Sequence, residues 1–208
     1  MDDRLRAVAD SVRGFMPSDE GLGLYEAGLT AAGLGPLLEI GAYCGKSAVY
    51  LGAAAQAKGT VVFSVDHHRG SEEHQAGEEY HDPALVDDEG RIDTLPEFRR
   101  SIARAHLEDV VVGVVGRSEV VAAKWRTPLG LVFIDGGHGQ EAAESDYEGW
   151  APWVLPGGLL VLHDVFEDPS EGGRPPYEIF RRALASGAFA ERGGVRTLRI
   201  LERVDDGL

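Results

Sequence analysis

Short apolar runs alternate with stretches of helical character along most of this chain, and this alternation restricts the fold more than any other feature. Pro36–Ile40 and Thr60–Val65 are short and mainly apolar, and Ser47–Ala57 between them has the composition of a helix. Strands that alternate with helices form parallel sheets, because each helix carries the chain back to the starting edge of the sheet. The sequence therefore predicts an α/β fold.

The rest of the chain continues this pattern up to its last two strands. Further strands are expected over Val110–Val115, Leu131–Ile134 and Gly158–Leu162, and further helices over Leu95–His106, Glu141–Trp153 and Tyr177–Ala185. The final strands, near Ala188–Ala190 and Val195–Leu201, are separated only by Glu191-Arg192-Gly193-Gly194, a spacing typical of a hairpin. We therefore expect a Rossmann-like, seven-stranded, mostly parallel sheet with an antiparallel last strand and helices on both faces.

Two segments lie outside the alternation. Residues 1–34 read as helices that precede the sheet, with a break at Pro17-Ser18-Asp19. Residues 67–95 are rich in Glu, Asp and His and show no clear period, which indicates an inserted lid or substrate loop within a single domain spanning residues 1–208. The alternative for this insertion is a merely solvated acidic loop.

The charge and the cysteine content exclude several classes of function. The 208-residue chain has a net charge of −15 and no cluster of Lys and Arg, which argues against a nucleic-acid partner. An acidic start and the lack of a long apolar run argue against a signal peptide or a membrane span, and we expect a cytoplasmic protein. Cys44 is the only cysteine, so an intrachain disulfide is excluded, and its place in a turn suggests tight packing.

A glycine-containing turn follows the first predicted strand. In Glu39-Ile40-Gly41-Ala42-Tyr43-Cys44-Gly45, the two glycines allow a tight turn that brings backbone amides and a helix N-terminus against a ligand. Asp66 ends the second strand, where a carboxylate can bind both hydroxyls of an adenosine ribose. A nicotinamide-binding oxidoreductase would show a third glycine, which this turn lacks. The motif therefore favours S-adenosylmethionine (SAM) over a dinucleotide.

The segment from Leu38 to Val49 resembles the first motif of catechol O-methyltransferases, which are class I SAM-dependent methyltransferases. The resemblance implies a SAM site whose parts are spread over several strand ends. It places Glu39, Gly41, Tyr43 and Ser47 at the methionine end of SAM, Asp66 at the ribose and Ser118 near the adenine. Gly45 in the same turn and Asp135, which ends a neighbouring strand beside the methyl donor, are also expected to bind the cofactor. Tyr43 could instead pack in the core, and Ser47 could cap a helix.

Acidic residues also end the fourth and fifth predicted strands. Asp135 and Asp164 would project side by side there, and such carboxylates repel each other unless a cation lies between them or one is protonated. The resemblance to metal-dependent small-molecule O-methyltransferases implies one divalent metal ion held by Asp135, His163 and Asp164. Mg²⁺ is the expected ion and Mn²⁺ is the alternative. His163 departs from the family pattern, because imidazole suits Mn²⁺, Fe²⁺ or Zn²⁺ better than Mg²⁺. His163 could instead contact a metal ligand without binding the metal itself. A further alternative is that His163 packs in the core and Asp164 caps a helix.

His138 matches the position of the catalytic lysine in catechol O-methyltransferases. A neutral imidazole can accept a proton near pH 7, so the resemblance implies His138 as general base. The alternative is that His138 caps the helix starting near Gln140.

The expected activity is metal-dependent O-methylation by SAM of a hydroxyl on a small polar acceptor. Gly137 replaces the tryptophan of catechol enzymes, and the insertion carries polar groups that hydrogen-bond polyols. The chain resembles small actinobacterial sugar O-methyltransferases, which implies a saccharide or glycosylated metabolite, such as a methylmannose oligosaccharide, with homodimer formation left open. The alternatives are a catechol or phenol O-methyltransferase and a non-catalytic SAM-binding regulatory protein.

Overall fold

A seven-stranded sheet forms the centre of the molecule, as the sequence predicts. A computed structural model describes residues 1–75, 77–78, 80–137 and 139–205. The strand order is β3-β2-β1-β4-β5-β7-β6, and β7 runs antiparallel to both β5 and β6. The strands are β1 Leu37–Ile40, β2 Val62–Asp66, β3 Val111–Val115, β4 Leu129–Ile134, β5 Val154–Leu162, β6 Phe189–Val195 and β7 Leu198–Arg203.

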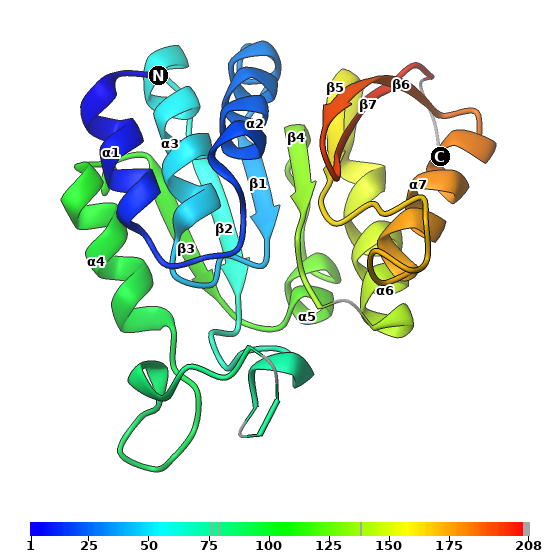
Figure 1. Ribbon diagram of the computed structural model, residues 1–208. Helices are drawn as coiled ribbons and strands as arrows, with labels where there is room; N and C mark the ends of the chain where they lie inside the picture. Colours follow the sequence, from blue (N-terminus) through cyan, green and yellow to red (C-terminus); the bar gives the residue numbers. More distant parts are fainter. Residues whose placement is uncertain (76, 79, 138, 206–208) are drawn as a thin grey trace.

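Helices cover both faces of this sheet (Figure 1). The α-helices are α1 Asp3–Ser11, α2 Ser18–Ala31, α3 Lys46–Lys58, α4 Leu95–Ala105, α5 Ser118–Ala122, α6 Gln140–Trp150 and α7 Pro175–Ala185. Successive strand residues face opposite sides, so Leu131 and Phe133 of β4 join the core beneath α1–α4, whereas Val132 and Ile134 join the core beneath α5–α7. Burial on both faces explains why the central strands read as continuous apolar runs.

The N-terminal helix α2 packs unusually close to α3. A methyl group added to Gly28 would lie 2.8 Å from Cβ of Ala54, and one added to Gly21 would overlap the ring of Tyr50. Both glycines therefore permit an approach that larger residues would prevent. This close packing places the start of α2, including Glu20, against the sheet rather than in solvent, and Glu20 is only 2% exposed.

The sequence-based prediction of the final hairpin is wrong in its turn. Glu191, Arg192, Gly193 and Gly194 belong to β6, where the pairing with β7 shifts between Glu191 and Gly193, and the turn consists of Arg196 and Thr197. Arg192 is the extra residue at this shift, and Gly193 and Gly194 pair with Ile200 and Arg199, because an extra residue can be inserted without ending the pairing. The predicted helix over 141–153 also divides, because Pro152 lies in a separate 3₁₀ turn at Ala151–Trp153.

The segment between β2 and α4 contains little regular structure. It includes two 3₁₀ turns, Glu72–His74 and Pro83–Leu85, and one antiparallel bridge between Val86 and Ile92. In Figure 1 this segment extends beyond the end of β2, away from the layered helices. Among the described residues, no helix is both long and apolar enough to cross a membrane.

Gly41 supplies a test of how the turn after β1 is built. Its φ is +89°, and an added Cβ would lie 2.0 Å from the carbonyl oxygen of Asp135. We expect Gly41→Ala to lower the free energy of unfolding by at least about 2 kcal/mol, because it combines an unfavourable backbone conformation with a backbone clash. Thermal and urea denaturation measure this loss.

Gly59→Ala is the matched control. Its φ is +70°, but an added Cβ would meet nothing within 4 Å. This variant should lose only about 1 kcal/mol, the contribution of the backbone conformation. Equal losses in the two variants would show that the contact between Gly41 and Asp135 does not constrain the turn.

Candidate active site

The turn after β1 brings together the ends of three neighbouring strands. Gly41, Tyr43 and Gly45 all have positive φ angles, which lets the chain reverse sharply before α3 begins at Lys46. The close contact between Gly41 and the carbonyl group of Asp135 places this turn directly against the end of β4. A helix N-terminus with unpaired backbone N–H groups therefore faces the same edge as the strand ends, which is an arrangement suited to a ligand.

Glu39 is a fully buried carboxylic acid directly before this turn. Burial raises its pKa to about 7, and the charges of Asp135 and Asp66 act in the same direction. The hydroxyls of Ser64 and Ser47 lie close enough to favour the charged form, but neither Glu39 oxygen accepts a well-formed hydrogen bond. A buried acid without a partner is unfavourable, so a cationic ligand group reaching Glu39 would stabilise it.

Asp66 lies beside the turn, as the sequence predicts. One carboxylate oxygen accepts a hydrogen bond from the backbone N–H of Tyr43 at 2.8 Å, and the other accepts one from the N–H of His68 at 2.6 Å. Each oxygen keeps a further acceptor position.

Cys44, in the same turn, is buried, and burial raises the pKa of its thiol to about 12, which excludes a thiolate at neutral pH.

Ser118, the predicted adenine contact, opens α5 and is already hydrogen-bonded on two sides. It accepts from the indole N–H of Trp150 at 2.7 Å and donates to Asp146, whose carboxyl is buried. Burial raises the pKa of Asp146 to about 6. A Cβ on Gly136 would lie 2.7 Å from the other Asp146 oxygen, so Asp146 connects the loop after β3 to the turn after β4. Asp146 was not predicted from the sequence, although it lies on the buried face of a predicted helix.

Asp135, His163 and Asp164 form a cluster at the ends of β4 and β5. One potential ligand atom from each residue lies within 4.8 Å of the other two. Nδ1 of His163 is 3.1 Å from Oδ1 of Asp135 and 3.3 Å from Oδ2 of Asp164. This nitrogen is buried and makes no well-formed hydrogen bond, despite its nearness to two carboxylates. The sequence thus correctly predicts that these three residues meet, and their donor set is one that divalent metal ions bind.

Glu20 of α2 is a member of this site that the sequence analysis missed. Its Oε2 lies 2.9 Å from Nε2 of His163, and its Oε1 accepts hydrogen bonds from the backbone N–H and the hydroxyl of Thr197, both at 2.8 Å. Burial alone would lower the pKa of His163, but Asp135 and the other two carboxylates outweigh it and raise that pKa well above its usual range. The only signal in the sequence was an acidic residue in the first turn of α2.

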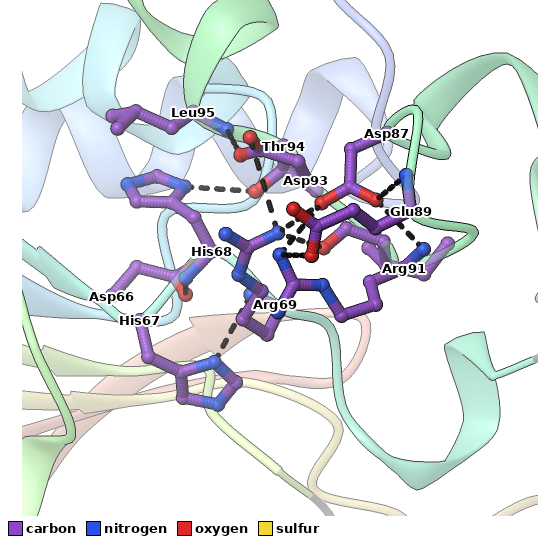
Figure 2. A network of polar contacts seen from close by, with 11 residues as sticks. Asp66, His67, His68, Arg69, Asp87, Glu89, Arg91, Asp93, Thr94 and Leu95 are labelled. Atoms are coloured by element: carbon purple, nitrogen blue, oxygen red, sulfur yellow. Dashed lines mark hydrogen bonds and ion pairs between the residues drawn. The ribbon is translucent and has the colours of Figure 1, made fainter.

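Hydrogen bonds and ion pairs organise the beginning and end of the segment between β2 and α4 (Figure 2). The Arg69 guanidinium lies 2.9 Å from a carboxylate oxygen of Asp87 and also donates to the carbonyl of Ile92. His68 Nδ1 and the hydroxyl of Thr94 lie 2.8 Å apart, which joins the two ends of the segment. The chain is thus tied back on itself beside Asp66.

The middle of this segment contacts the turn after β1 through aromatic rings. Tyr43 lies 5.0 Å from the ring of His74 and 5.8 Å from Phe15, and Phe15 lies 4.9 Å from Tyr80 in an edge-to-face arrangement. Arg13 also forms an ion pair with Asp82. The segment is therefore joined both to the turn and to the loop between α1 and α2.

The predicted base, His138, lies outside the described residues. The residues immediately before it, Gly136 and Gly137, follow Asp135 at the end of β4. Gly137 lines a small cavity together with Asp135, His163 and the apolar side chains of Ile134, Leu162 and Ile179. An acceptor group entering there would lie next to the Asp135–His163–Asp164 cluster.

Known proteins with the same fold include several O-methyltransferases. The O-methyltransferase NovP superposes with a TM-score of 0.67 at 17% identity, over 88% of this chain and 78% of its own. An O-methyltransferase from Bacillus cereus in complex with SAH gives 0.65 at 16% identity, over 99% and 92%. TomG from Streptomyces achromogenes, an O-methyltransferase involved in tomaymycin synthesis and solved with SAM, gives 0.61 at 16% identity, over 99% and 91%.

A family model also matches this sequence directly. The model describes a methyltransferase domain and matches residues 38–165, from the second residue of β1 to just beyond Asp164. The match includes the glycine turn, Asp66 and the cluster at the ends of β4 and β5, and it covers more than half of the chain. The chain therefore belongs to this methyltransferase-domain family.

Proposed function

We propose that this methyltransferase transfers the methyl group of SAM to a hydroxyl oxygen of a small polar acceptor, with a divalent metal held by Asp135, His163 and Asp164. The observation that carries the proposal is the position of this cluster directly beside the turn after β1. The Cα of Gly41 packs against the carbonyl group of Asp135, so a cofactor on the turn and an acceptor at the cluster would be neighbours.

SAM fits the groups that surround the turn. The carboxyl of Glu39 would meet the ammonium group of the methionine part, and Asp66 would accept hydrogen bonds from the ribose hydroxyls through its remaining acceptor positions. Gly45 and Ser47 lie at the start of α3, whose N-terminus favours a carboxylate. The structural relatives from Bacillus cereus and Streptomyces achromogenes were solved with SAH and SAM, which supports this cofactor.

The chain's own residues would then orient the acceptor and remove its proton. A bound divalent cation supplies a positive charge that lowers the pKa of an acceptor hydroxyl. We assign the proton to the imidazole of His138, which follows Gly137 in the sequence. The resulting alkoxide would attack the methyl carbon of SAM, the new O–C bond would form as the C–S bond breaks, and S-adenosylhomocysteine (SAH) would leave. The contact between Gly41 and Asp135 keeps donor and acceptor sites close together.

We propose a saccharide or glycosylated metabolite, such as a methylmannose oligosaccharide, as the acceptor. The polar side chains of the segment after β2 support this choice, because such groups hydrogen-bond polyols. In this proposal the segment acts as a lid that the aromatic contacts hold against the cofactor turn. A catechol or phenol is the second candidate, and the apolar lining formed by Ile134, Leu162 and Ile179 favours it.

Asp66→Ala tests the cofactor site. The substitution should weaken SAM binding by roughly 1.5 to 3 kcal/mol, the range for losing hydrogen bonds to a charged group. Isothermal titration calorimetry with SAM measures the change, and titration with NAD is the control for a dinucleotide site. Unchanged SAM affinity in a folded variant would remove Asp66 from the site.

Asp135→Ala and Asp164→Ala test the metal. Each variant should still bind SAM but lose metal-stimulated methyl transfer, because the cluster acts on the acceptor. Turnover is measured with labelled SAM and a panel of sugar and phenol acceptors, before and after treatment with EDTA. Full activity in EDTA-treated buffer, in the wild type or in either variant, would refute the metal-dependent mechanism.

His138→Ala distinguishes a general base from a helix cap. Loss of a base should reduce kcat on the order of 10²- to 10⁴-fold with little effect on SAM affinity. In the wild type, kcat should rise with pH as the imidazole loses its proton, with an apparent pKa of about 6.5, the value of an ordinary histidine. The measurement is kcat against pH for both proteins, with thermal denaturation as the folding control. A less stable variant with nearly normal kcat and the same pH profile would identify a cap instead.

A further inference from the structure

We propose that Glu20 is a positioning residue that makes His163 a metal ligand through Nδ1, and that the site consequently binds a transition-metal ion such as Mn²⁺ or Zn²⁺ in preference to Mg²⁺. The inference rests on the metal site of the proposed function and adds a residue from outside the strand ends that form it.

The geometry around His163 assigns a different task to each ring nitrogen. Nε2 faces Glu20 at 2.9 Å, whereas Nδ1 faces the carboxylates of Asp135 and Asp164. Nδ1 is buried and lacks a well-formed hydrogen bond, although acceptor oxygens lie 3.1 and 3.3 Å away. A nitrogen that is close to two carboxylates but makes no well-formed hydrogen bond to either is available as a third ligand atom. That arrangement suits a shared cation.

Glu20 fixes the tautomer of the ring. Its Oε1 is occupied by two donors from Thr197, one of which is a backbone N–H, so Oε2 remains facing His163. A carboxylate only accepts hydrogen bonds, so Nε2 has to carry a proton and donate it. A neutral imidazole protonated at Nε2 has its lone pair on Nδ1, which is the tautomer required for coordination beside Asp135 and Asp164.

The choice of metal follows from the ligand set. Mg²⁺ prefers oxygen ligands and binds imidazole poorly, whereas Mn²⁺, Fe²⁺ and Zn²⁺ accept nitrogen and oxygen together. His163 is only 6% exposed, and Glu20 holds its ring from the far side, so the imidazole cannot easily turn away to leave an all-oxygen site. A rival explanation is that His163 is permanently protonated and itself neutralises the three carboxylates without a metal.

Glu20→Gln separates these explanations with a minimal change. The backbone N–H of Thr197 requires an acceptor, so the amide oxygen of Gln would stay with Thr197 and its NH₂ group would face Nε2. Nε2 would then have to accept, which moves the ring proton to Nδ1 and blocks coordination. Asp19→Asn is the matched control, because Asp19 precedes Glu20 and forms a surface ion pair with Arg196 through Oδ2. Its Oδ1 accepts a hydrogen bond from the backbone N–H of Glu20, which the amide oxygen of Asn can still accept.

The experiment uses the full chain saturated with SAH, labelled with ¹⁵N-histidine and titrated with Zn²⁺. The His163 resonances are assigned by their loss in His163→Gln. We expect Zn²⁺ to shift Nδ1 while Nε2 stays protonated, in the wild type and in Asp19→Asn. In Glu20→Gln the proton should lie on Nδ1, and this shift should disappear. Calorimetry should show Mn²⁺ binding more tightly than Mg²⁺, with Mn²⁺ affinity about 10- to 100-fold weaker in Glu20→Gln than in wild type.

Two results would overturn the inference. One is a His163 that keeps both ring protons at saturating Zn²⁺, which identifies the permanently protonated ring. The other is Mn²⁺ affinity in Glu20→Gln equal to that of the wild type. Both are distinguishable from failure of the proposed function, which would appear as methyl transfer that persists in EDTA. SAH affinity and thermal denaturation of Glu20→Gln show whether the variant is folded.

Discussion

The site depends on the parallel pairing of β1 with β2 on one side and β4 on the other. Ile40 aligns with Val65 and with Ile134, so the three strands end at the same level of the sheet. The residues that follow, Gly41, Asp66 and Asp135, therefore lie along one edge without any loop having to bring them together. β5 continues this edge, because Leu162 aligns with Ile134 and places His163 next to Asp135. Parallel strands make such an edge available to ligands, and the side chains decide its chemistry.

The sequence predicted the parts of the site that follow strand ends, because apolar runs mark where those strands stop. Asp66, Asp135, His163 and Asp164 are all found in this way, and the structure brings the last three together as expected. The strands themselves were predictable for the same reason, since burial on both faces leaves a simple apolar pattern.

Other parts depend on contacts that no local pattern reveals. Glu20 and His163 are 143 positions apart, and the packing of α2 on α3 and on the sheet brings them into contact. Asp146 has the sequence context of an ordinary acidic residue on a helix, and its hydrogen-bond partner, the hydroxyl of Ser118, lies on another element. The hairpin turn was misplaced because Gly193 and Gly194 are typical turn residues, whereas the fold uses them in a bulged strand and turns at Arg196 and Thr197.

The bonds from Glu20 to Thr197 join residues 177 positions apart, nearly the whole length of the chain. A ribosome therefore releases the helix that contains Glu20 long before it makes the turn that anchors it. During synthesis, Glu20 lacks two of its donors until Thr197 has left the ribosome, and a domain generally folds as a unit. The anchored pair of Glu20 and His163 then forms only when the last hairpin adds β7 beside β5. A nascent chain that stalls before this hairpin would carry the methyltransferase motif but not the finished support of His163.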